Sequence, residues 1–257
     1  MSDAALLSVR RLSKAFAGVR AVQDFSLDVQ PGEVVGLIGP NGAGKSTIIN
    51  LVSGFHRADS GEVVFRGQSI LGKNPDTIAR LGMVRTFQHI RLFPSLTVRE
   101  NVEAAAQSRS TVSLLDALLR TPHYRRTMTD MAREADDLLR LFEVAGVDAQ
   151  LAGTLPYGHQ RRIEIVRALA TAPALLLLDE PAAGMNDVEA GALADFLANV
   201  ARRQRLAIVL VEHHLDVVMR LCQRVVVLDH GATLASGTPD EVTHHPDVVR
   251  AYLGEVV

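Results

Sequence analysis

The chain has 257 residues, 47% of them hydrophobic, and its 27 Lys and Arg against 29 Asp and Glu give a formal net charge of −2. This much apolar material can form a core, so wholesale disorder is excluded. The nearly balanced charge does not indicate nucleic acid as a partner, because phosphate neutralisation needs a concentrated basic face.

The sequence also carries few signals for a cellular compartment or for membrane insertion. The single cysteine, Cys222, cannot form an intrachain disulfide, which favours a reducing compartment. Residues 1–7 lack the basic start and long apolar run of a signal peptide, so we expect no leader. The most apolar stretch, 168–178, is interrupted by Thr171 and Pro173 and is shorter than the roughly 20 residues of a membrane span. We therefore expect a chain that does not itself cross a bilayer.

The first predicted elements are strands. Residues 21–29 lead into Pro31-Gly32 and are expected to form part of an antiparallel hairpin. Residues 34–38 are apolar, largely β-branched and followed by Gly39-Pro40, which predicts a buried strand. A continuous rather than alternating apolar run is typical of a sheet covered on both faces, as in α/β proteins.

A glycine-rich loop follows this strand and opens a helical stretch, 47–52. It matches the phosphate-loop pattern G-x-x-x-x-G-K followed by Ser or Thr, and its candidate nucleotide-binding residues are Gly39, Pro40, Asn41, Gly42, Ala43, Gly44, Lys45, Ser46 and Thr47. Glycines let backbone N–H groups turn toward phosphate oxygens, and the helix presents its positive N-terminal end to the anion. Lys45 supplies charge for the β- and γ-phosphates, and Ser46 offers a hydroxyl to Mg²⁺. The alternative, a chance glycine-rich turn with a lysine, is disfavoured by the flanking strand.

Residues 97–146 have a helical pattern. Apolar residues recur at spacings of three and four, at Met131, Ala135, Leu138, Leu139 and Phe142. Thr121-Pro122 interrupts the pattern once, and Gly146 is expected to end it. We interpret residues of about 97–152 as a helical subdomain inserted into an α/β core that comprises about 6–96 and 153–257.

A second site element follows the apolar run 175–178, which ends in Asp179 and Glu180. A buried strand would deliver Asp179 to its carboxyl end, where ligands of open α/β sheets bind. There Asp179 is expected to hold the hydration shell of Mg²⁺ and Glu180 to polarise an attacking water. The alternative is two capping acids after a core strand, which the phosphate loop disfavours. The remaining predicted elements are strands at 207–211 and 225–228 and a hairpin turn at 229–231.

The order of these elements resembles the ATP-binding subunits of ABC transporters over nearly the whole chain. Thr86-Phe87-Gln88 resembles the Q-loop, whose glutamine reaches Mg²⁺ and the water. Residues 155–160 stand where the family signature, usually LSGGQ, is expected, so the resemblance implies that Gly158 contacts nucleotide. His213 lies in the place of the switch histidine, and Phe16 in that of the aromatic that stacks on adenine.

The resemblance implies a fold and a division of roles. The fold is α/β, a P-loop NTPase (RecA-like) core with an antiparallel β subdomain and an inserted α-helical subdomain. The implied catalytic residues are Gln88, Glu180 and His213, and the implied Mg²⁺ residues are Ser46, Gln88 and Asp179.

Several of these residues also have a purely structural interpretation. Without the family order, Phe16 would be assigned to the core, Gln88 to the polar surface and His213 to a satisfied structural role. His213 and His214 are adjacent, so in a strand they would point to opposite faces. The motif favours His213 as the one that faces the γ-phosphate.

Three positions depart from the family pattern. Pro156 replaces the usual signature serine, and Tyr157 replaces the first signature glycine. Residues 181–186 resemble the start of the family's D-loop, in which Asn186 replaces the usual aspartate. These departures concern the nucleotide held by a partner chain and leave the residues around this chain's own phosphates untouched. A helix is predicted over about 160–170, with Arg161 and Arg162 on a solvated face.

Within this family, the chain most resembles one branch. Its markers are residues 85–93, 118–126, 158–165, 179–186 and 237–254, which together look like the ATPase subunit of bacterial branched-chain (hydrophobic) amino acid uptake systems. The resemblance implies ATP and Mg²⁺ as cofactors, and ATP hydrolysis that powers import from the cytoplasmic face of the inner (plasma) membrane. It also implies a second ABC ATPase subunit, usually a different chain, together with membrane permease subunits and a periplasmic binding protein that acts indirectly.

Other function classes stay open. A soluble ABC ATPase acting on nucleic acid or ribosomes often carries a fused second cassette, coiled-coil inserts or basic arms, which the sequence does not show. A regulatory module that binds nucleotide without hydrolysis is disfavoured by Glu180 and His213. An importer ATPase for another small solute is the nearest alternative, because the sequence does not name the solute.

Overall fold

The computed structural model describes residues 5–110, 112–142 and 146–253. The chain divides into two compact units, which are described separately: unit 1 comprises Met1–Gln88 and Ala174–Val257, and unit 2 comprises His89–Pro173. Unit 2 is wider than the insert of about 97–152 expected from the sequence. The reason is that it includes the helix Tyr157–Leu169 (α6), which packs on the other helices of this unit.

An antiparallel sheet forms one layer of unit 1. Its strands are ordered β2-β1-β4-β5 and comprise Leu7–Phe16 (β1), Val19–Val29 (β2), Ser60–Phe65 (β4) and Gln68–Ser69 (β5). Leu7 and Val9 of β1 are buried, because side chains of a strand point alternately to opposite faces. The antiparallel piece predicted over 21–29 is confirmed, and its strand begins at Val19.

A second, six-stranded sheet has the order β10-β9-β3-β8-β7-β6. Its strands are Val34–Ile38 (β3), Met83–Arg85 (β6), Leu175–Asp179 (β7), Ala207–Val211 (β8), Arg224–Asp229 (β9) and Ala232–Gly237 (β10). All run parallel to their neighbours except β10, which returns antiparallel to β9. Every residue of β3, β7 and β8 is buried, so the continuous apolar runs are confirmed as strands covered on both faces.

The hairpin predicted at 229–231 is confirmed between β9 and β10. His230 and Gly231 have positive φ values of 43° and 81°, which a tight hairpin turn requires. Gln23 of β2 donates from Nε2 to the His230 carbonyl at 2.9 Å, so the turn is also tied to the antiparallel sheet.

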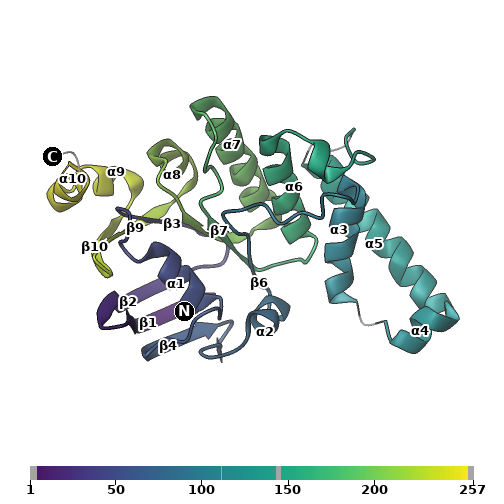
Figure 1. Cartoon of the computed structure of the whole chain (residues 1–257), viewed down its shortest axis with the longest axis horizontal. Coiled ribbons are helices and arrows are strands. Elements are labelled where there is room, and N and C mark those ends of the chain that lie inside the picture. Colours follow the sequence, from purple (N-terminus) through teal and green to yellow (C-terminus); the bar gives the residue numbers. More distant parts are fainter. Residues whose placement is uncertain (1–4, 111, 143–145, 254–257) are drawn as a thin grey trace. The chain divides into compact units, whose positions relative to one another are not determined.

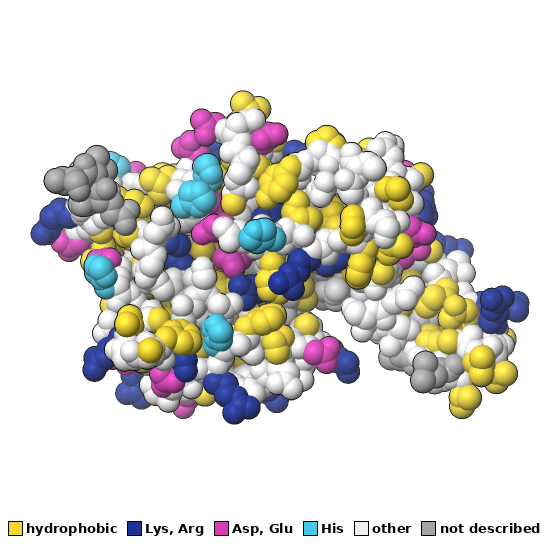
Figure 2. Space-filling view, viewed as in Figure 1, with side chains coloured by type: hydrophobic (Ala, Val, Ile, Leu, Met, Phe, Trp, Pro, Cys, Tyr) yellow, Lys and Arg dark blue, Asp and Glu magenta, His cyan; other side chains and the backbone are white. Residues whose placement is uncertain are grey.

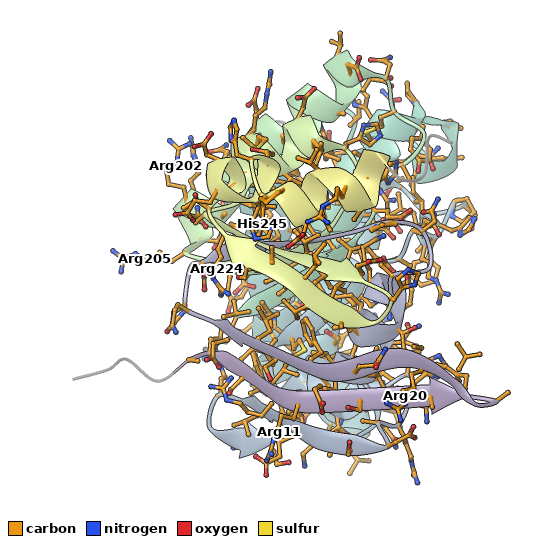
Figure 3. All side chains as sticks on the ribbon, turned by 90° about the vertical axis from the view of Figure 1, so that its left-hand side faces the viewer. Arg11, Arg20, Arg202, Arg205, Arg224 and His245 are labelled. Atoms are coloured by element: carbon orange, nitrogen blue, oxygen red, sulfur yellow. The ribbon has the colours of Figure 1, made fainter. Side chains whose placement is uncertain are left out.

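Arg224 ties the two sheets of unit 1 together at the start of β9 (Figure 3). Its Nε donates to Glu33 Oε1 at 2.9 Å, and its Nη2 donates to the Asp28 carbonyl of β2. Figure 3 also shows Arg11, Arg20, Arg202 and Arg205, which come from different elements of unit 1. These arginines are spread over the surface rather than gathered around one groove.

Helices cover both faces of the parallel sheet (Figure 1). In unit 1 they comprise Lys45–Val52 (α1), Pro75–Arg80 (α2), Asp187–Gln204 (α7), Leu215–Leu221 (α8), Pro239–Thr243 (α9) and Pro246–Leu253 (α10). α1 lies between the two sheets, whereas α7 and α8 cover the opposite face of the parallel sheet. The core accordingly joins residues of both sheets and of α1, such as Leu37, Phe25 and Ile48. This packing fixes the position of the first turn of α1.

Unit 2 is helical, as the sequence predicts for most of its length. Its helices are Val98–Ala106 (α3), Leu114–Leu119 (α4), Pro122–Leu141 (α5) and α6, with short 3-10 turns at Gln107–Arg109 and Ala152–Thr154. The interruption predicted at Thr121-Pro122 is the boundary between α4 and α5. There Thr121 Oγ1 accepts the Tyr124 N–H, and proline is tolerated at the first helical position.

The end of α5 differs from the prediction. The helix stops at Leu141 rather than at Gly146, because Phe142 leaves the helical conformation with φ −108° and ψ 20°. Residues 143–145 lie outside the described residues. Within the part of the chain that the structure describes, none of the helices combines the length and apolar character of a membrane span.

Candidate functional site

The glycine-rich loop connects the buried strand β3 to the first turn of α1. Gly39 and Gly44 have φ values of 149° and 99°, and both are tightly enclosed. A Cβ atom at Gly39 would lie 2.2 Å from the Leu228 carbonyl oxygen, and one at Gly44 would lie 2.4 Å from the Ala21 carbonyl oxygen. Because neither position accepts a side chain, the two glycines fix the path of the loop.

Lys45 folds back onto this loop. It is only 6% exposed, and its Nζ donates to the carbonyl oxygens of Gly39 at 2.6 Å and Pro40 at 2.8 Å. These carbonyls stabilise an ammonium group that burial alone would destabilise. Ser46, in the same first turn of α1, is exposed. One short segment therefore presents a cation, a hydroxyl and the N-terminal N–H groups of a helix, which is an anion-binding arrangement.

The carboxylate of Asp179, the last residue of β7, is held by Arg85 at the end of β6. Arg85 Nη2 donates to Asp179 Oδ2 at 2.8 Å, and the two side chains are only 9% and 10% exposed. Arg85 Nη1 donates to Asn50 Oδ1 at 2.6 Å and to Ser53 Oγ at 3.2 Å. One arginine therefore joins the acidic end of β7 to α1, the helix that follows the glycine-rich loop.

Two aromatic rings flank the Arg85 guanidinium. Its Cζ lies 5.4 Å from the ring centroid of Phe55 and 5.0 Å from that of Phe87, and the two rings meet edge to face at 5.6 Å. Cation–π contacts strengthen where solvent is excluded, so the rings help to hold the guanidinium. Sequence reasoning missed Arg85, because its contacts join segments that are far apart in the chain.

Gln88 and Glu180 lie in direct contact. Gln88 Nε2 donates to Glu180 Oε2 at 2.8 Å. Glu180 has a left-handed φ of 47°, a conformation that costs a non-glycine residue of order 1–3 kcal/mol. Its N–H donates to the Val211 carbonyl of β8 at 2.9 Å, which helps to maintain the turn. The structure thus gathers Gln88, Asp179 and Glu180 at the carboxyl-terminal edge of the parallel sheet.

A buried glutamate, Glu212, joins the loops that follow β7 and β8. Its Oε1 accepts the Ala182 N–H at 2.7 Å, and its Oε2 accepts the His213 N–H at 3.1 Å. These bonds compensate the burial of the carboxylate. The Cys222 thiol is itself buried, and this burial, together with the smaller effect of the Glu212 charge, raises its pKa to about 12. Sequence reasoning missed Glu212, although a charged residue directly after a wholly apolar strand is a usable signal.

The expected opposite orientation of His213 and His214 is wrong. β8 ends at Val211, so the alternation of a strand does not extend to this pair. The two rings lie beside one another instead, with centroids 4.6 Å apart and an interplanar angle of 38°. The His213 side chain is 51% exposed.

Phe16 is not a core residue. It ends β1 and is 41% exposed. Its ring meets His56 edge to face at a centroid distance of 5.5 Å, and Lys14 Nζ lies 5.3 Å from the ring centroid. An exposed aromatic face is what stacking on a nucleotide base requires.

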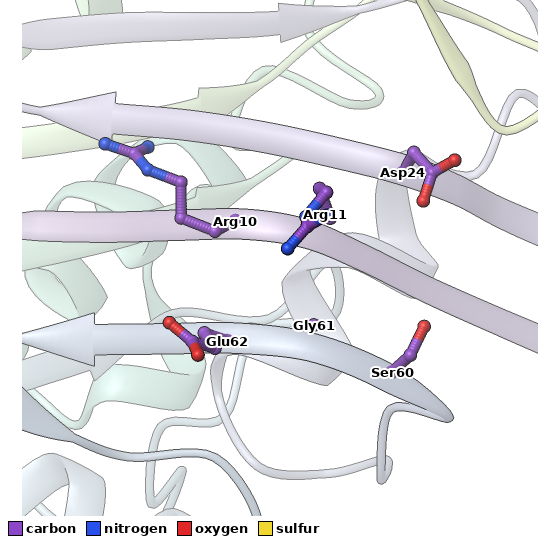
Figure 4. A pocket seen from close by; sticks show the side chains of 6 residues that line it. All are labelled: Arg10, Arg11, Asp24, Ser60, Gly61 and Glu62. Carbon is purple, nitrogen blue, oxygen red and sulfur yellow. The ribbon is translucent and has the colours of Figure 1, made fainter.

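Of two surface hollows of unit 1, one lies on the antiparallel sheet and the other between that sheet and the strands β9 and β10. One, of about 500 Å³, is shown in Figure 4 and is lined by Arg10, Arg11, Asp24, Ser60, Gly61 and Glu62. The other, of about 420 Å³, lies beside Arg224 and is lined in part by Asp28. Arg10 lines both and pairs with Asp28 at 2.7 Å. Neither of these two hollows is lined by the glycine-rich loop or by Asp179, so the candidate site is assigned from the chemistry of its residues.

Comparison with protein families identifies the chain. The model of the ABC transporter family matches residues 22–183. The chain belongs to the ABC transporter family of ATP-binding proteins. A second family model, described as branched-chain amino acid ATP-binding cassette transporter, matches residues 232–257. As a member of the ABC family, the chain is an ATPase.

Several ABC proteins are similar over almost their whole length. The high-affinity branched-chain amino acid transport ATP-binding protein LivG of Escherichia coli K12 is 42% identical over 97% of this chain and 98% of its own. BraF of Pseudomonas aeruginosa, which carries the same description, is 40% identical over the same shares. The solved ADP conformation of MJ1267, an ATP-binding cassette of an ABC transporter, has a TM-score of 0.84 at 30% identity and covers 98% of this chain and 99% of its own. The predicted α/β fold is therefore confirmed.

Residues 155–160, which stand where the ABC signature is expected, lie in unit 2, whereas the other candidate site residues lie in unit 1. Pro156 is the N-cap of α6, and the helix begins at Tyr157, earlier than the predicted start near residue 160. Tyr157 is 44% exposed. A Cβ atom at Gly158 would meet nothing within 4 Å, so no contact with the described residues requires a glycine there.

The solvated face expected for Arg161 and Arg162 is wrong for Arg161. This side chain is 0% exposed, and its Nη1 donates to Glu164 Oε2 at 2.7 Å. Glu164 Oε1 in turn accepts the Arg91 N–H at 3.0 Å. Glu164 supplies the neutralising partner that a buried arginine needs. Through its bond to Arg91, it also anchors α6 to the start of unit 2. Arg162 is half-buried.

Proposed function

We propose that this chain is the ATP-hydrolysing subunit of an importer for branched-chain (hydrophobic) amino acids. Similarity to LivG and BraF over nearly the whole chain, together with the match at residues 232–257, supports the transport half of the proposal. The contact of Gln88 with Glu180, directly after Asp179 in the chain, supports the assignment of the hydrolytic residues.

The nucleotide would bind at the glycine-rich loop. Lys45 would exchange its bonds to the Gly39 and Pro40 carbonyls for bonds to the β- and γ-phosphate oxygens. The loop N–H groups and the N-terminus of α1 would hold the remaining phosphate charge. The exposed ring of Phe16 would stack on adenine. These groups come from one sheet edge and one helix start, whose positions the core of unit 1 fixes.

The donor set fits Mg²⁺. Among the described residues, no group of three or more His, Cys, Asp or Glu side chains could hold a metal by itself. Mg²⁺ suits such a site, because it is usually bound by one or two protein oxygens together with substrate phosphates and water. Ser46 and Gln88 would supply those oxygens, and Asp179 would hold the hydration shell of the ion. When bound, Mg²⁺ would neutralise charge on the β- and γ-phosphates.

Glu180 would act on the attacking water. Gln88 occupies one oxygen of the Glu180 carboxylate, so the reaction requires this pair to rearrange or to share the water. Gln88 is the last residue of unit 1 and His89 the first of unit 2, so rearrangement at Gln88 would be passed along the chain into the helical unit. Glu212 would hold the backbone of His213, the residue proposed to face the γ-phosphate.

A second ABC ATPase subunit would complete the two nucleotide sites. Gly158 and the N-terminus of α6 would face the nucleotide of that partner. Because Pro156 and Tyr157 depart from the signature, we favour a different chain as the partner over a second copy. Membrane permease subunits would receive the conformational change, and a periplasmic binding protein would deliver the solute. This assembly places the chain at the cytoplasmic face of the inner membrane.

The test is transport by the reconstituted assembly. The chain, its companion ATPase and the permease subunits are placed in proteoliposomes with the binding protein, and uptake of leucine, glutamate and ribose is compared. We expect ATP-dependent leucine uptake that Lys45→Ala abolishes. Uptake of another solute in place of leucine would contradict the substrate. ATPase activity stimulated by ribosomes or nucleic acid without permease subunits would support the soluble alternative.

A further inference from the structure

α4 exposes a cluster of leucines in unit 2. Leu115, Leu118 and Leu119 are 70%, 79% and 71% exposed. Their spacing of three and four residues places them on one side of the helix. Scattered exposed leucines are ordinary on protein surfaces, but a contiguous apolar cluster indicates an interaction surface.

Polar contacts at both ends maintain this helix. Ser113 Oγ accepts the Asp116 N–H at 3.1 Å, and Asp116 Oδ2 accepts the Ser113 N–H at 3.3 Å, which forms a capping box. At the other end, Thr121 Oγ1 donates to Asp116 Oδ1 at 3.0 Å. A helix as short as Leu114–Leu119 is marginal by itself, so these bonds preorganise it while its leucines remain exposed.

Basic residues flank the leucine cluster. Arg120 follows α4 directly, and Arg125 and Arg126 lie at the start of α5, all three exposed. Between residues 113 and 126 the only acidic side chain is Asp116, whose carboxylate is engaged in the caps. Figure 2 shows hydrophobic and Lys or Arg side chains next to one another over α4 and the start of α5.

We propose that α4 and the start of α5 form a contact surface for an anionic lipid bilayer. Leucines would enter the boundary between headgroups and acyl chains, and the arginines would pair with lipid phosphates. A stable protein interface uses about 20–30 residues on each side, far more than this short helix presents. A bilayer surface needs only apolar side chains beside positive charge, which is the composition found here. The proposal does not depend on the transported solute or on the roles of the nucleotide-site residues.

The absence of tryptophan from the chain allows a direct test. Leu118→Trp places a single fluorophore in the cluster, and Val188→Trp, at a position 83% exposed in α7, is the matched control. Each variant is mixed with vesicles of phosphatidylcholine alone or with phosphatidylglycerol, both with brominated acyl chains. We expect a blue shift and quenching for Leu118→Trp with the anionic vesicles only. Unchanged ATP binding and melting temperature show that each variant is folded.

The contribution of the arginine charges to vesicle binding is tested in the Leu118→Trp variant. Arg120→Gln, Arg125→Gln and Arg126→Gln, combined with Leu118→Trp, should weaken vesicle binding by about tenfold or more, because each arginine near an anionic surface contributes to binding. Equal quenching of Leu118→Trp and Val188→Trp, or no quenching with anionic vesicles, would overturn the proposal. Crosslinking of Leu118→Cys to a permease subunit, without lipid quenching, would also overturn it and assign the surface to a protein partner.

Discussion

The glycine-rich loop of unit 1 and the signature segment of unit 2 differ in what constrains their residues. Gly39 and Gly44 accept no side chain, because backbone carbonyls of the same chain lie within 2.2 Å and 2.4 Å of a Cβ atom. Gly158, by contrast, has open space around a Cβ atom, and Tyr157 is exposed. Residues proposed to serve the chain's own nucleotide are therefore fixed by contacts within the chain. Residues proposed to serve a partner's nucleotide can change without disturbing the fold.

Asn186 supports the same distinction. It is the N-cap of α7, where its Oδ1 accepts the Glu189 N–H at 3.0 Å and Glu189 bonds back to its N–H. Asn and Asp cap helices about equally well. The departure from the usual aspartate therefore has no cost for folding, and any consequence falls on the assembled pair.

The largest effect is expected in unit 1, at the residue proposed to act on the attacking water. Glu180→Gln should lower the turnover of the assembled transporter by about 10²–10⁴-fold, because the carboxylate that acts on water is lost. ATP binding should be unchanged, and the ATP-bound pair should persist on gel filtration. Glu62→Gln, at an exposed position of β4, is the matched control. Wild-type turnover of Glu180→Gln would reject the role of Glu180.

Removing the loop cation should give the next largest effect. Lys45→Ala should weaken ATP affinity by about 10–100-fold, in line with the roughly 1.5–3 kcal/mol of a hydrogen bond to a charged group. Equilibrium binding of a fluorescent ATP analogue measures it, with the exposed Lys73→Ala as control. If the two variants bind ATP equally well, Lys45 does not contact the phosphates.

The elements at the nucleotide end were predictable because their signals are local. A continuous apolar run predicts β3, and Gly39 to Thr47 carry their pattern within one short segment. Asp179 and Glu180 follow directly from the strand before them. In each case the chemistry and the element that positions it are neighbours in the sequence.

The remaining features depend on contacts between distant segments or on where an element stops. Arg85 acts through Asn50 and Asp179, and Glu212 through Ala182, which no single-sequence pattern connects. The relation of His213 to its neighbour depends on β8 ending at Val211. The burial of Arg161 belongs to the same group, because an arginine and a glutamate one helical turn apart are equally typical of an exposed helix face.

At the signature end, Gly158→Asp separates folding from function. Alanine or aspartate should not destabilise this chain, because the position is open and lies in the first turn of α6, where acidic side chains are favourable. In the assembled pair, Gly158→Asp should lower turnover by about tenfold or more, since like charges brought together cost several kcal/mol. Gly158→Ala is the control for bulk alone. Normal turnover of Gly158→Asp would remove Gly158 from the partner's site.

A smaller change in turnover is expected at Arg85, with a clear effect on stability. Arg85→Met leaves the Asp179 carboxylate buried without its ion-pair partner, which should lower the free energy of unfolding by about 3–5 kcal/mol. The Mg²⁺ concentration needed for tight ATP binding should also rise, because Asp179 loses its orientation. Denaturant unfolding and Mg²⁺-dependent nucleotide binding measure the two effects. Arg66→Met, at an exposed position beside Phe65, is the control; it should lower the free energy of unfolding far less and leave the Mg²⁺ requirement unchanged.

The smallest effect is expected at Pro156, and it sharpens the comparison most. Pro156→Ser restores the usual signature serine at the N-cap of α6, where serine can accept a backbone N–H and contribute about 0.5–2 kcal/mol. Loss of proline costs about 0.4–1 kcal/mol, because the unfolded chain gains conformational entropy. The two contributions oppose one another, so the free energy of unfolding should hardly change. Turnover should also change little, because Gly158 and the N-terminus of α6 provide backbone contacts that do not need the hydroxyl. Denaturant unfolding and ATPase assays of the assembled pair measure both. A large rise in turnover would show that the missing hydroxyl limits the partner's site, and the departure at Pro156 would then be functional rather than tolerated.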